Sequence, residues 1–260
     1  MTSFLINTVL LEKNRWEEGR NPSIAVSEWL PKIKKDGFDG VELWENHGLK
    51  ASEPEIQLLK HASVPVKVYN SYVSFDDGDS QKRAKAANMI NRLRANKVKF
   101  NFGNDSERIE EYIQNFHAWK QQLHNECTFL CECHPGTVME DPKIARDVID
   151  RIGSHNIGAM IHPFHKSTDL SSWFNYLGEK IIYAHVSLFD GSRFHLLERY
   201  PEFVEERIQV LKENGFEGDF SLEFTEGTAE EYETPQQLYQ NAIRDLAFLK
   251  VRWKRLAKEI

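Results

Sequence analysis

The chain has 260 residues, of which 28% are charged, and its formal net charge is −7 at pH 7. This length allows a large buried core, either as one closed α/β barrel or as two small domains, and no Pro/Gly/Ser-rich linker divides the chain. The acidic balance supplies no positive field for phosphate backbones or acidic lipids, which argues against nucleic acid and membrane surfaces as partners.

The N-terminal residues and the cysteines bear on location. The first apolar run has no basic flank before it and charges follow it at once, so it predicts neither a signal peptide nor a membrane span. Cys127, Cys131 and Cys133 gather on or beside one predicted strand, and an odd count without paired spacings favours reduced thiols over a disulfide framework or a zinc knuckle. We therefore expect a cytoplasmic protein.

Short apolar runs alternate with amphipathic stretches along the whole chain. The apolar runs predict strands at residues 4–11, 40–44, 64–72, 98–103, 129–133, 157–164, 181–188 and 219–224. Helical patterns follow at residues 24–37, 52–62, 80–96, 106–122, 141–153, 170–178, 202–215 and 235–256. Eight successive units of one strand and one helix predict parallel strand pairing in an α/β fold. Their number predicts a single (β/α)8 TIM barrel over residues 1–260. A doubly wound open sheet is the alternative, but its glycine-rich turn is missing after the first strand.

Polar residues late in four successive predicted strands stand out, because the active site of such a barrel lies at the carboxyl ends of its strands. They are Glu132, His162, His185 and Glu223. Two carboxylates and two imidazoles that converge on one point predict a divalent metal site. Taken singly, each histidine is more often a hydrogen-bonded core residue than a metal ligand, and each glutamate is equally explained as the partner of a basic residue on a neighbouring strand.

The segments "LCECH", "MIHPFH", "YAHVS" and "SLEFT", together with "GFDGVELW", resemble the xylose isomerase-like barrel superfamily. This superfamily holds sugar and keto-sugar isomerases and epimerases, inosose and dehydroshikimate dehydratases, and endonuclease IV. By position, Glu132 matches the first Glu of its metal site, His165 the His of Asp-x-x-His, His185 the later His and Glu223 the last Glu. His162 departs from the pattern, since it stands where the family has Asp.

The resemblance implies an enzyme with one divalent metal ion, usually manganese; His162 in place of Asp favours a softer metal, so zinc, iron and cobalt stay open. It implies an isomerase or epimerase that moves a proton next to the carbonyl of a small sugar, keto-sugar or cyclitol, with Glu132 and Glu223 as the acid and base. A lyase or dehydratase acting on a keto-sugar or keto-glycoside at the same site is the alternative.

Further residues near strand ends are candidates for substrate contact: Glu42, His134, His165 and Arg193. Glu42 has the family's position for a carboxylate that supports the metal ligands or faces the substrate. It is equally explained as the partner of Lys67 or Lys99. Trp16 and Trp44 are either sugar-stacking walls or packing residues.

The sequence leaves two hypotheses from other functional classes open. An endonuclease IV-like repair enzyme would need a larger metal cluster with more histidines and a basic surface, and the net charge is −7. A barrel that has lost catalysis is kept open by His162 in place of the family's Asp. The expected partner is a small-molecule sugar or keto-sugar, and formation of a homo-oligomer is left open.

Overall fold

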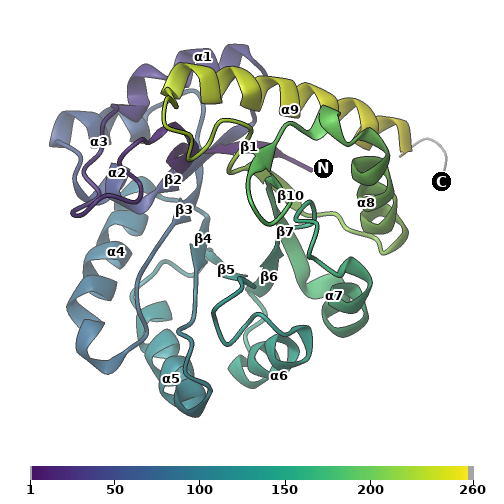
Figure 1. The fold of residues 1–260 in the computed structure, drawn as a ribbon. Coiled ribbons are helices and arrows are strands. Elements are labelled where there is room, and N and C mark those ends of the chain that lie inside the picture. The colour runs from purple at the N-terminus through teal and green to yellow at the C-terminus, as the bar shows by residue number, and fades with distance from the viewer. Residues whose placement is uncertain (1, 257–260) are drawn as a thin grey trace.

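Eight parallel strands close into a barrel at the centre of the molecule. The computed structural model describes residues 2–256, and Figure 1 shows these strands surrounded by helices. The strands are β1 (Phe4–Asn7), β2 (Gly40–Trp44), β3 (Val66–Asn70), β4 (Lys97–Phe100), β5 (Thr128–Glu132), β6 (Ile157–Ile161), β7 (Ile181–Val186) and β10 (Asp219–Leu222). They pair in the order β1-β10-β7-β6-β5-β4-β3-β2, and every neighbouring pair is parallel. The predicted (β/α)8 barrel is confirmed.

All but one of the expected strands end one to four residues early, and two of them show why. The first stops at Asn7, whose side chain accepts a hydrogen bond from the Val9 amide at 3.1 Å and so begins a 3-10 turn over Thr8–Leu11. The seventh ends before the chain turns into a small antiparallel hairpin, β8 (Leu188–Phe189) with β9 (Phe194–His195). Nothing in the sequence pattern indicated this hairpin, because its strands have two residues each.

Helices cover the outside of the barrel. They are α1 (Leu30–Lys35), α2 (Glu45–Leu49), α3 (Glu53–Lys60), α4 (Ser80–Leu93), α5 (Ile109–Lys120), α6 (Pro142–Ile152), α7 (Leu170–Leu177), α8 (Pro201–Glu213) and α9 (Pro235–Leu256). The expected helix at residues 24–37 is shorter, because Pro31 has no amide hydrogen and is tolerated only in the first turn. Helix α2 was not expected. No helix within residues 2–256 is long and apolar enough to cross a membrane.

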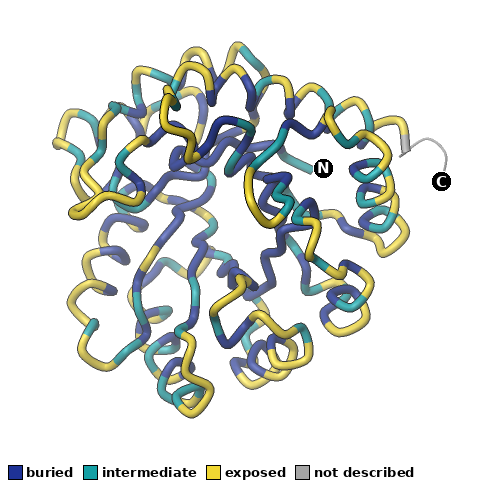
Figure 2. The backbone as a smooth tube through the Cα atoms, viewed as in Figure 1, coloured by how far each residue is buried: buried dark blue, intermediate teal, exposed yellow. Residues whose placement is uncertain are grey.

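The apolar core has two layers, one inside the barrel and one between the strands and the helices. The inner cluster consists of Leu5, Val68, Leu130, Met160 and Tyr183. The outer cluster is much larger, and Figure 2 shows the buried strands inside a ring of helices that are exposed on their outer faces. Side chains alternate along a strand, so the next inward position beyond the inner cluster lies at the carboxyl end of each strand. At this end of the barrel, the inward-facing side chains include the polar residues that the sequence singled out.

Candidate metal centre

Four buried polar residues converge at the carboxyl end of the barrel. Glu132 ends β5, His162 directly follows β6, His185 lies late in β7 and Glu223 directly follows β10. One ligand atom from each lies within 4.8 Å of the others, and their exposed fractions are 4%, 5%, 0% and 7%. Within residues 2–256 this is the one group of such residues with metal-site spacing. The structure therefore brings together all four residues that the strand-end pattern singled out.

The distances within this group suit a cation between its members. Glu132 Oε1 lies 3.0 Å from His162 Nε2 and 3.4 Å from His185 Nδ1. Glu223 Oε2 lies 3.3 Å from His185 Nδ1 and 3.7 Å from His162 Nδ1. Both Nδ1 atoms are buried without a hydrogen-bond partner in the described chain, which is costly for a polar atom. Nitrogen and oxygen donors in this arrangement could hold a divalent ion such as manganese, iron, cobalt or zinc.

Glu42 lies behind His185 and fixes its orientation. The Glu42 carboxylate accepts hydrogen bonds from His185 Nε2 at 2.9 Å, from the Tyr183 hydroxyl at 2.8 Å and from Asn7 Nδ2 at 3.0 Å, and all four residues are fully buried. Since Nε2–H donates to Glu42, Nδ1 is the atom of His185 that faces Glu132 and Glu223, and it can bind a cation once it has lost its proton. A carboxylate in this position is a common support for a metal-bound histidine.

The alternative explanation of Glu42, as the partner of a barrel lysine, is wrong. Lys67 donates to the Ser3 hydroxyl at 3.0 Å. Lys99 instead lies 2.7 Å from Glu132 Oε2, with exposed fractions of 2% and 5% for the two side chains. The buried partner foreseen for a strand-end glutamate therefore exists, but it belongs to Glu132.

Lys99 and Asn101 orient the Glu132 carboxylate. Asn101 Nδ2 donates to Glu132 Oε2 at 2.7 Å and its Oδ1 accepts from Lys99 Nζ at 2.6 Å. Burial alone raises the pKa of Glu132, but the charge of Lys99, the hydrogen bond from His162 and the neighbouring His185 outweigh it and hold the pKa well below its usual range. Glu132 is thus a carboxylate at neutral pH, with Oε2 occupied and Oε1 directed at the histidines. Lys99 was missed as a site residue, although it lies two positions before Asn101 and so shares its inward face.

The remaining charges of the group are also interdependent. Burial lowers the pKa of His185, but the nearby Glu223 and Glu42 carboxylates outweigh burial and raise that pKa well above its usual range. Burial raises the pKa of Glu223, and the charge of His185 reverses this and lowers it. Without a cation, the two carboxylates are therefore balanced in part by a proton on His185. A cation bound at this site would compete with this proton for Nδ1 of His185.

A cavity of about 370 Å³ opens beside the group, and we call it the reaction cavity. Glu132 and Glu223 line it together with Lys99, Asn101 and His134, and the aromatic side chains of Trp16, Tyr72 and Phe224 form its walls. Trp16 is 58% exposed and its ring lies 5.9 Å from that of Phe224. Trp44, in contrast, is 1% exposed and packs against His47, so it is a core residue.

The other expected substrate contacts lie at different distances from the group. The His165 ring lies 4.6 Å from the His162 ring, and its Nε2 is 3.0 Å from the Ser187 hydroxyl. Burial and the neighbouring His162 lower the pKa of His165 to about 3, so it is neutral. The exposed His134 ring lies 5.8 Å from that of His162.

Arg193 is not brought to the reaction cavity. It lies in the turn between β8 and β9, where its amide donates to Asp190 Oδ1 at 3.0 Å. Its exposed side chain lines a separate recess that also includes Arg199 and Glu226. The hairpin directs it there, and because the hairpin was not foreseen, the position of Arg193 was not foreseen either.

A model of the xylose isomerase-like TIM barrel family matches residues 30–250. The chain belongs to this family. Among the curated proteins, none matches the sequence. The suspected resemblance is thus confirmed at the level of the family.

Solved structures with this fold include epimerases and a dehydratase. A D-psicose 3-epimerase from Clostridium cellulolyticum is 12% identical, with a TM-score of 0.72 over 97% of this chain and 99% of that one. The probable 3-DHS dehydratase AsbF from Bacillus anthracis is 17% identical, with a TM-score of 0.67 over 96% and 98%. An IOLI protein with a bound zinc atom is 13% identical, with a TM-score of 0.72 over 96% and 99%. At these identities, the likeness establishes the fold.

Proposed function

We propose that this protein is a divalent-metal-dependent isomerase or epimerase that moves a proton next to the carbonyl of a small sugar, keto-sugar or cyclitol. The observation that carries the proposal is the convergence of Glu132, His162, His185 and Glu223 within 4.8 Å, with two buried nitrogen atoms that lack a partner. Manganese is the expected ion, and the two imidazoles leave zinc, iron and cobalt as alternatives. Family neighbours that are epimerases agree with this reading.

The metal ion would be held by these four side chains, and when bound it would polarise a substrate carbonyl and so acidify the neighbouring C–H bond. Glu132 and Glu223 both line the reaction cavity and are both carboxylates at neutral pH, as a proton acceptor must be. Lys99 and Asn101 hold Glu132 in one orientation, whereas Glu223 contacts the two imidazole rings. We assign the two glutamates to opposite proton transfers: one carboxylate removes the proton from carbon, and the other first takes up a proton from water and then returns it to that carbon.

A lyase or dehydratase outcome is the second candidate, and one observation favours it. A dehydratase shares the fold over 96% of this chain. The same carboxylate pair would remove the proton next to the carbonyl, and a leaving group on the adjacent carbon would then depart with the electron pair. The substrate decides between the two outcomes.

Two measurements test the proposal. Elemental analysis of gently purified protein should find one divalent ion per chain, and the double variant His162→Ala/His185→Ala should lose it. In D2O, NMR should show deuterium entering a ketose from a panel such as D-psicose, D-fructose and D-tagatose at the carbon next to the carbonyl. Absence of stoichiometric metal together with absence of exchange across the panel would refute the proposal and leave the inactive-barrel hypothesis.

Glu223→Gln tests the assignment of the proton acceptor. The amide cannot accept the proton, so exchange should fall by at least about a hundredfold while the fold is retained. Glu217→Gln is the matched control, because Glu217 is exposed shortly before β10 and lines no part of the reaction cavity. Unchanged exchange in Glu223→Gln would assign the base to another group.

A further inference from the structure

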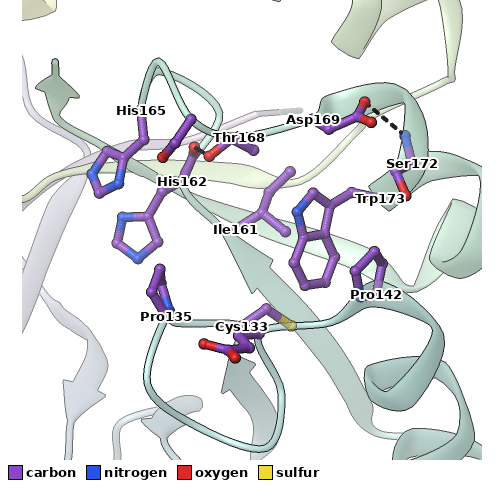
Figure 3. A pocket seen from close by; sticks show the side chains of 12 residues that line it. Cys133, Pro135, Pro142, Ile161, His162, His165, Thr168, Asp169, Ser172 and Trp173 are labelled. Carbon is purple, nitrogen blue, oxygen red and sulfur yellow. Dashed lines mark hydrogen bonds between the residues drawn. The ribbon is translucent and has the colours of Figure 1, made fainter. Parts of the chain in front are cut away.

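A second pocket, of about 220 Å³, lies on the other side of His162 between the loops that follow β5 and β6; we call it the side pocket. Figure 3 shows Ile161, Trp173 and Pro142 lining one part of it and His162 with His165 lining another. Ile161 is 1% exposed and Trp173 is 8% exposed, so the pocket has an apolar floor.

The side pocket begins at the candidate metal centre. His162 lines the side pocket and is also one of the four converging residues. Consecutive residues separate the two spaces, since His134 lines the reaction cavity and Pro135 lines the side pocket. The His134 and His162 rings lie 5.8 Å apart. The side pocket and the reaction cavity are therefore adjacent, with His162 of the candidate metal centre bordering the side pocket.

The size of the side pocket suits part of a ligand. Pockets that enclose a whole small-molecule ligand measure roughly 300–1,000 Å³. The side pocket, at about 220 Å³, is below this range, while the reaction cavity, at about 370 Å³, is near its lower end. Two adjacent spaces of this kind are appropriate for a ligand made of two ring-sized parts.

The polar groups of the side pocket favour a neutral ligand that carries hydroxyls. Its rim includes the carboxylates of Glu140 and Asp169 and the hydroxyl of Ser167, and its described lining contains no lysine or arginine. Asp169 Oδ1 accepts from the Ser172 amide at 3.1 Å, and Glu140 Oε2 accepts from the Gly136 amide at 2.7 Å. Carboxylates accept hydrogen bonds from hydroxyls and repel an anionic group, while the apolar floor can pack against the C–H face of a sugar ring.

We propose that the side pocket binds the second ring of a neutral two-ring glycoside whose first ring occupies the reaction cavity. The inference rests on the proposed function and narrows its substrate class from a free monosaccharide to a glycoside such as a disaccharide. The side pocket supplies affinity for the second ring through the apolar floor and the hydroxyl-binding rim. His162 and His165 lie at the junction of the two rings.

The test compares disaccharides with their own monosaccharides on the metal-loaded protein. Isothermal titration with cellobiose, maltose, lactose and sucrose, and with glucose, galactose and fructose, gives a dissociation constant for each. For at least one disaccharide the dissociation constant should be about tenfold or more below those of both of its monosaccharides. If every disaccharide of the panel binds no more tightly than its monosaccharides, the inference is wrong.

A bulky substitution at the side pocket tests whether the tighter binding of the disaccharide arises there. Ser167 is exposed at the rim, so Ser167→Trp should fill the side pocket without disturbing the core. The disaccharide advantage, which is the ratio of the monosaccharide to the disaccharide dissociation constant, should then fall to about one. Ser171→Trp is the matched control, because Ser171 is an exposed residue of α7 outside the pocket lining, and it should keep the full advantage. An advantage that survives in Ser167→Trp would overturn the assignment. Thermal unfolding by circular dichroism verifies that both variants fold.

Failure of this inference is distinguishable from failure of the proposed function. If the proposed function fails, the protein lacks stoichiometric metal and catalyses no deuterium exchange. If only the side-pocket assignment fails, metal content and exchange persist, and the ratio of disaccharide to monosaccharide affinity is the same in the parent protein and in Ser167→Trp.

Discussion

The two histidines of the candidate metal centre differ in what supports them, although their rings lie only 5.2 Å apart. His185 is fully buried, and its Nε2 is held by Glu42, which Tyr183 and Asn7 hold in turn. His162 contacts Glu132 through Nε2, its Nδ1 has no hydrogen-bond partner in the described chain, and its ring borders the side pocket. His185 on β7 is therefore held in one orientation before any ligand binds. His162, after β6, borders a pocket that a ligand can enter.

Removal of His185 should have the largest effect. His185→Ala takes away one proposed metal ligand and leaves the Glu42 carboxylate buried without its imidazole partner, so the free energy of unfolding should fall by about 3–5 kcal/mol. Bound metal should fall below detection. Urea unfolding and elemental analysis measure the two losses. His162→Ala is the comparison variant, and it should also lose most of the metal but a smaller part of the free energy of unfolding. Equal losses of stability in the two variants would contradict the proposed difference in support between His185 and His162.

Glu42→Gln tests the support of His185 without removing a ligand. The amide weakens the hydrogen bond that fixes the His185 tautomer, and metal affinity should fall by about 10–100-fold. A competitive chelator titration measures the change. Glu53→Gln, on the exposed surface of α3, is the control and should bind metal as the parent does. If Glu42→Gln keeps the parent's affinity, the carboxylate is not an essential support of the metal ligand.

Metal affinity should depend on pH because of His185. The folded pKa of His185 is raised, through Glu223 and Glu42 acting against burial, so in the metal-free protein its proton stabilises the fold at low pH and this contribution is lost as pH rises through the raised pKa. A cation must displace that proton. The affinity should therefore rise by about tenfold per pH unit below the raised pKa and level off above it. Chelator titrations at several pH values measure the slope, and a flat profile would show that no proton is displaced.

His162→Asp should have the smallest effect. A carboxylate there restores the family's ligand type and adds an anion, so the variant should retain metal and shift its preference towards manganese or magnesium over zinc. Competition between these ions, followed by elemental analysis, gives the preference. The preference should change several-fold, because position 162 borders the side pocket and can accommodate a different metal-binding atom. Loss of all metal in this variant would instead place His162 among the rigidly required residues.

The sequence by itself determined the barrel and the four residues that converge in the candidate metal centre. Apolar runs that alternate with amphipathic stretches predict parallel βα units, and the alternation of side chains along a strand places Glu132 and its counterparts on the inward face. Both are local properties, readable over a few residues. The strand ends were less accurate where side chains compete with pairing, as at Asn7, whose side chain caps a turn.

Only the tertiary structure decided which groups support the four converging residues and which pocket lies beside them. Glu42 and His185 are 143 residues apart, and only the closure of the barrel brings them into contact. Lys99 reaches Glu132 because β4 pairs with β5 in a particular register. The side pocket forms between two loops, and the hairpin after β7 carries Arg193 elsewhere. These contacts depend on register and on loop conformation, which are set by the packing of the whole chain, so no local pattern specifies them.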